Sequence, residues 1–190
     1  MRAFYLAATT RQVMGPYCYA GLSRVADAVS HKSSWVDALT DRCDFPPSLQ
    51  RELEAVGESL EGEKKERCKI LIFLRHCWCF HKHATKPLGQ KDASDLAKAM
   101  NMPEYACARL LELFAVPRPG GGHAVTKQLK DKRCAYMLVL YVLAAGGEDV
   151  KVSDVAPFAA DMKLEAGKAG EMLRQAGFIV KKGKGGGGRR

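Results

Sequence analysis

The chain has 190 residues, 47% of them hydrophobic, which is enough to bury a core. No uninterrupted apolar stretch reaches the ~18 residues that a membrane span needs, so we expect no membrane partner. The net charge is +9, and seven scattered cysteines indicate free thiols in a reducing compartment.

The positive charge is unevenly distributed along the chain. Residues 1–62 have six basic and eight acidic side chains, residues 63–125 have eleven and six, and residues 126–190 have thirteen and seven. The excess in the last two thirds favours a polyanionic partner, nucleic acid in particular. A charge excess that only aids solubility is the alternative.

Residues 1–62 are predicted to be a linker-like lead-in. Prolines punctuate it at 15–16 and 45–47, and a short helix is expected within 49–60. The acid-free stretch 1–26 faintly resembles a transit peptide, but a linker is the better interpretation.

Residues 63–125 are predicted to form a first helical domain, and residues 126–184 a second. In the first, the pattern indicates helices over 63–83 and 92–100, a third helix after Pro103, and a two-stranded wing turning over 117–123. In the second, it indicates helices over 127–145, 152–162 and 165–176, a strand over 178–180 and a basic wing over 181–184. Residues 185–190 are expected to be a flexible basic tail.

The two predicted domains repeat one pattern. Both long helices contain the pair Arg-Cys, at 67 and 133, where the repeated copies begin, and both second helices open on Ser-Asp, at 94 and 153. In the third helices, four apolar positions recur at an offset of 62: Cys107, Leu110, Leu111 and Phe114 match Ala169, Met172, Leu173 and Ala176. The order predicts a mainly α fold of tandem winged helix-turn-helix domains with short β wings.

Five segments carry a resemblance to a known family. They are Arg67-Cys68 with Phe73-Leu74, Leu110 to Phe114, Lys130 to Tyr136, Val152 to Val155, and Met162 to Leu164. With them, the stretch from about Glu66 to Gly183 resembles the C-terminal tandem winged-helix region of the forty-nine-kilodalton subunit of DNA-directed RNA polymerase I. The family's N-terminal β-rich module has no counterpart in this sequence.

The resemblance implies a role like that of the second subunit of general transcription factor IIE. The tandem domains would bind DNA beside the polymerase cleft, and the preceding linker would cross it, supporting initiation and elongation of ribosomal RNA transcription. The implied partners are DNA and the other RNA polymerase I subunits, in the nucleus and nucleolus, with no small-molecule substrate.

Winged-helix units contact DNA through the third helix, the wing and the basic ends of helices. We expect sequence-independent phosphate contacts with strong salt dependence. The candidate DNA-binding residues are Lys127, Lys130, Lys132, Arg133, Lys168, Arg174, Lys181, Lys182 and Lys184.

Two other functions remain open. One is a winged-helix scaffold whose basic faces meet acidic proteins, as in endosomal sorting or proteasome-lid assemblies. The other is a small zinc enzyme, because His76, Cys79 and His83 share one helical face. No catalytic motif is evident, so we expect a non-enzyme without metal or cofactor.

Overall fold

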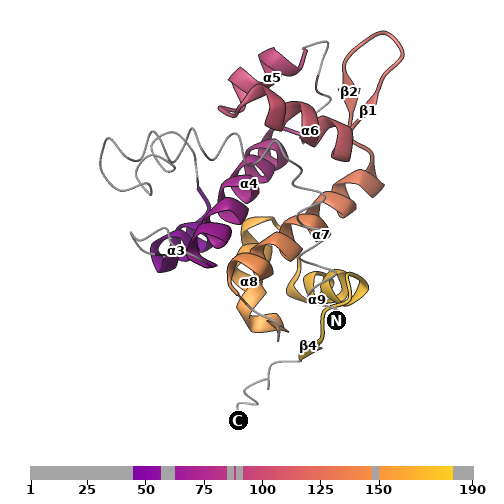
Figure 1. Cartoon of the computed structure of the whole chain (residues 1–190). Coiled ribbons are helices and arrows are strands. Elements are labelled where there is room, and N and C mark those ends of the chain that lie inside the picture. The colour runs from indigo at the N-terminus through magenta and orange to yellow at the C-terminus, as the bar shows by residue number, and fades with distance from the viewer. Residues whose placement is uncertain (1–44, 57–62, 85–87, 89–91, 147–149, 182–190) are drawn as a thin grey trace, which may run out of the picture.

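The protein is described by a computed structural model over residues 45–56, 63–84, 88, 92–146 and 150–181. These residues are mainly helical, and two long helices cross at the centre of the molecule with the smaller elements grouped at either end (Figure 1). The mainly α class predicted from the sequence is therefore confirmed.

The first group of elements follows the predicted order closely. It consists of helices α4 (Glu63–His83), α5 (Ala93–Ala99) and α6 (Glu104–Phe114), followed by strands β1 (Val116–Pro117) and β2 (His123–Ala124). The two strands pair antiparallel, as expected for the hairpin predicted over 117–123. Three consecutive glycines at its tip have positive φ angles of 93°, 94° and 77°, a conformation that glycine adopts at little steric cost.

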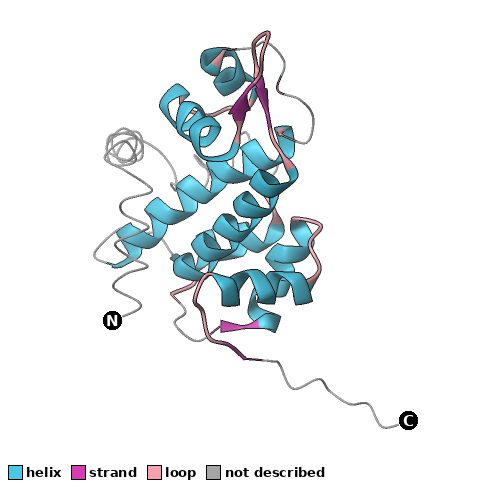
Figure 2. Cartoon of the chain, turned by 90° about the vertical axis from the view of Figure 1, so that its right-hand side faces the viewer, coloured by secondary structure: helices cyan, strands magenta, loops and turns pink. Residues whose placement is uncertain are grey.

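The second group repeats the helices and adds a different pair of strands. It consists of α7 (Lys127–Ala144), β3 (Val150–Lys151), α8 (Val152–Asp161), α9 (Ala166–Gln175) and β4 (Val180–Lys181). The two strands pair in parallel, with Val150 opposite Val180 (Figure 2). The strand predicted over 178–180 begins two residues later, and the rest of the predicted basic wing, from Lys182, lies outside the described residues, as does the tail 185–190.

The two long helices α4 and α7 make the most extensive contact between elements, and the buried residues of both groups join one hydrophobic cluster. Phe73 on α4 meets Tyr136 on α7 edge to face, with ring centroids 6.4 Å apart. Near the far end of the crossing, Arg67 Nε of α4 donates to the Ala144 carbonyl of α7 at 2.5 Å. The two predicted domains thus share a core along this helix pair.

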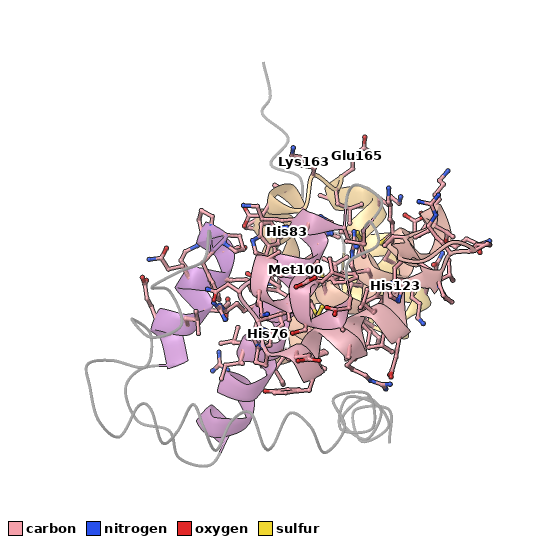
Figure 3. All side chains as sticks on the ribbon, turned by 90° about the horizontal axis from the view of Figure 1, so that it is seen from above. His76, His83, Met100, His123, Lys163 and Glu165 are labelled. Atoms are coloured by element: carbon pink, nitrogen blue, oxygen red, sulfur yellow. The ribbon has the colours of Figure 1, made fainter. Side chains whose placement is uncertain are left out.

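The turn between the second and third helices is the part of the repeat that the structure reproduces most closely. Asn101 and Lys163, 62 residues apart, both adopt left-handed φ angles, 49° and 58°. Each directly follows the C-cap residue of a helix. The next residue is hydrophobic, and its N–H bonds back to a carbonyl five positions earlier, Met102 to Ala97 at 3.0 Å and Leu164 to Ala159 at 2.8 Å. Figure 3 shows Lys163 and Glu165 of the second turn at the outer edge of the molecule.

The Ser-Asp match has an offset of 59, and the structure explains the difference of three residues. Both aspartates, Asp95 and Asp154, occupy the third position of their helices. Helix α8 has ten residues and α5 has seven, so their ends recur at 62 and their starts at 59.

One repeated apolar position was predicted wrongly. Ala176 is exposed, whereas its counterpart Phe114 is fully buried. The reason is that α9 ends at Gln175 and turns at Gly177, whose φ is 93°. Phe178 then fills the space, since its N–H bonds to the Leu173 carbonyl at 3.0 Å and its side chain is buried.

The end of the lead-in forms helix α3 (Pro47–Val56), which begins two residues before the stretch 49–60 where a short helix was expected. Leu49 and Leu53 are fully buried in the shared core. Ser48 binds the Asp161 carboxylate of α8 through its N–H at 3.4 Å and its hydroxyl at 2.5 Å. Helix α3 packs on both α4 and α8 and so ties together the two groups of elements. The remaining residues of the predicted lead-in, 1–44 and 57–62, lie outside the described residues, so its linker character stays a prediction.

Candidate nucleic-acid interface

The N-terminal end of α7 gathers three of the predicted DNA-binding side chains. Lys127, Lys130 and Lys132 are all exposed there. Thr126 caps this helix, because its hydroxyl accepts the Leu129 N–H at 3.3 Å. Lys127 and Lys130, three positions apart, lie on one side of this helix end, whereas Lys132, two positions after Lys130, lies on another side.

The charge at this helix end is unusual for its position. A helix N-terminus carries a partial positive charge and is stabilised by acids, yet the first turn of α7 contains none. Lysines there cost helix stability, about 0.3–1 kcal/mol each at an exposed site. The lysines and the positive end of the helix dipole together attract anions such as phosphate.

Lys132 connects this surface to the third helix of the first group. Its Nζ donates to the Leu113 carbonyl at the end of α6 at 3.3 Å, and it lies 5.9 Å from the centroid of the Phe114 ring. The cation therefore satisfies a carbonyl at a helix C-terminus, where positive charge is favourable.

Lys168 connects the same surface to the third helix of the second group. Its Nζ lies 3.1 Å from Asp131 Oδ1, and both side chains are about half exposed. Because Asp131 is on α7 and Lys168 is on α9, the ion pair joins the two helices. We call the exposed lysines at this end, Lys127, Lys130 and Lys132 of α7 with Lys168 of α9, the α7 surface.

Arg174 and Lys181 lie elsewhere. Residues on one helix six positions apart point in different directions, so Arg174 does not share the Lys168 side of α9. Its guanidinium and the Val180 side chain both lie beside Gly170, which places Arg174 next to β4 and Lys181. Both cations are exposed. The predicted residues Lys182 and Lys184 follow in the chain, outside the described residues.

Arg133 does not belong to an exposed surface, contrary to the prediction. Its side chain is only 2% exposed, and its guanidinium lies over the Phe80 ring of α4, 5.6 Å from the centroid. Its Nε and Nη1 have no hydrogen-bond partner among the described residues. Burial lowers the pKa of this guanidinium, while the nearby thiols of Cys134 and Cys77 act in the opposite direction.

A sequence signal for this burial exists. Arg133 is four, seven and eight residues before Met137, Leu140 and Tyr141, which are also buried. This spacing places it on the apolar stripe of α7 that faces α4. Arg133 is also the last residue of a basic run, and it was assigned to DNA binding from that run rather than from this periodicity.

One exposed cation was not singled out from the sequence. Arg118 lies in the hairpin between β1 and β2, where its N–H donates to the Gly122 carbonyl at 3.1 Å. The hairpin ends two residues before the N-cap of α7. A basic side chain at a hairpin tip directly before a basic helix start was the available signal.

The comparison with known families decides the affiliation of the chain. The model of the A49-like RNA polymerase I associated factors matches residues 23–188. The chain belongs to this family. Among curated proteins and among solved structures, no match was found.

The family match extends further towards the N-terminus than the resemblance recognised in the sequence. It begins at residue 23 rather than near Glu66, and so includes helix α3. In this A49-like factor, α3, the two helical groups and the α7 surface therefore all lie within the stretch that the family model matches.

The histidine-rich end of α4 holds no assembled metal site. No three His, Cys, Asp or Glu side chains among the described residues are grouped to hold a metal ion. His76 and Cys79 are buried, whereas His83 is exposed at the helix end. Burial, and to a lesser degree Arg75, lowers the pKa of His76 to about 3. Within the described part of this A49-like factor, no helix is long and apolar enough to cross a membrane.

Proposed function

We propose that this A49-like factor binds DNA within the RNA polymerase I machinery, through phosphate contacts that discriminate little between sequences. Such a role would place it in the nucleus and nucleolus, supporting initiation and elongation of ribosomal RNA transcription, with other polymerase subunits as partners. Family membership supports the polymerase association. The observation that carries DNA binding is the convergence of Lys127, Lys130, Lys132 and Lys168 on one end of α7.

We also propose that the two helical groups are winged-helix units, in domains bounded near 63–125 and 126–184. In support, each group has a long helix followed by a short helix, a tight left-handed turn and a third helix. The first group ends in an antiparallel hairpin, as a wing does.

The charges of the first group indicate where DNA does not lie. The exposed acids of its second and third helices are Asp92, Asp95, Glu104 and Glu112. These four acids outnumber the two cations of α5 and α6, Lys98 and Arg109, and Arg109 is already paired with Glu112 at 2.8 Å. Because this surface would repel phosphate, we place the DNA at α7 and the adjoining hairpin and leave out α5 and α6.

The test is a salt titration of DNA affinity. Wild-type protein should bind two unrelated duplexes with similar affinity, and the logarithm of the binding constant should fall linearly with the logarithm of salt concentration. The double variant Lys127→Gln/Lys130→Gln should reduce the slope by about 2, since each lost phosphate contact removes about 0.9. The matched variant Lys82→Gln/Lys98→Gln removes two exposed cations away from this surface and should preserve the slope.

Two results would contradict the proposal. Equal slopes for both double variants would move the DNA surface away from α7. Absence of binding at low salt would favour the scaffold function, in which the basic surface meets an acidic protein.

A further inference from the structure

The acidic residue within the basic surface is the feature that the proposed function does not explain. Residues 127–133 contain four cations and a single acid, Asp131. A carboxylate at this position weakens the attraction of the α7 end for phosphate. Its side chain is about half exposed and lies 3.1 Å from Lys168 Nζ.

The pairing with Asp131 determines whether Lys168 is available to bind phosphate. Lys168 is the one predicted third-helix cation that the structure brings to the α7 surface, and Asp131 is the group that binds it. A carboxylate and a phosphate compete for the same ammonium, because both bind it through negatively charged oxygens. An exposed pair of this kind contributes little stability, so a phosphate can displace Asp131 at small cost.

Building on the proposed function, we infer that Asp131 is an internal competitor of DNA phosphate for Lys168. It limits the affinity of the α7 surface and leaves Lys168 to contribute fully only when the carboxylate is displaced. Asp131 is therefore a positioning residue that sets how tightly the surface holds the DNA backbone.

The expected effect follows from the number of phosphate contacts. Asp131→Asn keeps the size of the side chain and one of its acceptor oxygens but removes its charge. Lys168 then becomes available to one more phosphate, so the salt slope should steepen by about 0.9 and the affinity near 0.1 M salt should rise roughly five- to tenfold. The melting temperature should be unchanged, since the lost ion pair is exposed.

A double-mutant cycle separates competition from the general removal of a negative charge. Under competition, the gain from Asp131→Asn disappears when Lys168→Gln is also present. Glu171→Gln, which removes an exposed acid one turn further along α9, serves as the matched control and should raise the affinity much less.

Each outcome has a definite consequence. If Asp131→Asn leaves affinity and slope unchanged, or raises affinity equally in the Lys168→Gln background, Asp131 does not compete for Lys168, although the proposed DNA binding stands. If the wild-type protein binds no DNA at any salt concentration, the proposed function and this inference fail together.

Discussion

Replacing Arg133 by methionine should stabilise the protein without weakening its binding to DNA. The guanidinium is 2% exposed, and two of its nitrogens, Nε and Nη1, have no hydrogen-bond partner among the described residues. Methionine is long and flexible enough to fill the same space between α4 and α7 with apolar atoms.

The magnitude follows from the groups removed. Each buried donor without an acceptor costs about 1–3 kcal/mol, and the substitution removes two. Against this, the variant loses the contact of the cation with the Phe80 ring, which is worth about 2 kcal/mol when shielded from water. The difference spans about 0–4 kcal/mol. The free energy of unfolding should therefore rise by about 2 kcal/mol, in line with other replacements of buried ionic groups by apolar ones.

The assays are urea denaturation and the salt titration of DNA affinity. Lys130→Met, on the same helix but exposed, is the matched control: it should preserve stability and lose affinity, the opposite pattern. A loss of stability on Arg133→Met would show that the guanidinium makes interactions essential to the core. A flatter salt slope for this variant would return Arg133 to the DNA-binding surface and refute the reasoning from burial.

Two further predictions concern stability. His76 has a pKa lowered to about 3 by burial and by Arg75, so the folded protein holds it neutral while the unfolded chain protonates it near pH 6.5. The contribution of neutral His76 to the free energy of unfolding is therefore complete above pH 6.5 and declines as the pH falls towards 3. In denaturation curves between pH 7 and 5, His76→Gln should reduce the pH dependence of this free energy by up to about 1.4 kcal/mol per pH unit. The exposed His83→Gln is the control, and an equal pH dependence for the two variants would contradict burial of a neutral imidazole. Lys163→Gly should raise the free energy of unfolding by about 0.5–1 kcal/mol, because glycine adopts a φ of 58° without steric cost. Asn101→Gly should raise it less, since asparagine tolerates left-handed φ angles. A lower stability of Lys163→Gly in urea denaturation would refute the left-handed turn.

Helix positions were largely predictable because their signals are local. Thr126 caps α7, Asp92 caps α5 and Pro103 precedes α6, and each expected boundary lies within about two residues of the observed one. The error at Ala176 arose because the offset of 62 was carried to the last position of the predicted helix, whereas α9 ends one residue earlier, at Gln175, before the turn at Gly177.

The candidate site was only partly predictable. A run of lysines identifies a basic segment, but it does not say which side of a helix each residue occupies once another helix packs on it. Arg133 was therefore assigned to DNA although it faces α4. The pairing of Asp131 with Lys168 joins residues 37 positions apart, and no local pattern indicates it.

The sequence by itself determined the helical repeat, the basic character of the second and third portions of the chain and the family, because periodicity, capping and composition are properties of neighbouring residues. Only the tertiary structure decided how the repeats combine. The packing of α4 on α7 buries Arg133, the bond from Ser48 to Asp161 spans 113 positions, and α9 is brought against the basic end of α7. Such contacts depend on which apolar faces meet, and that is settled by burial of the whole core rather than by any one segment.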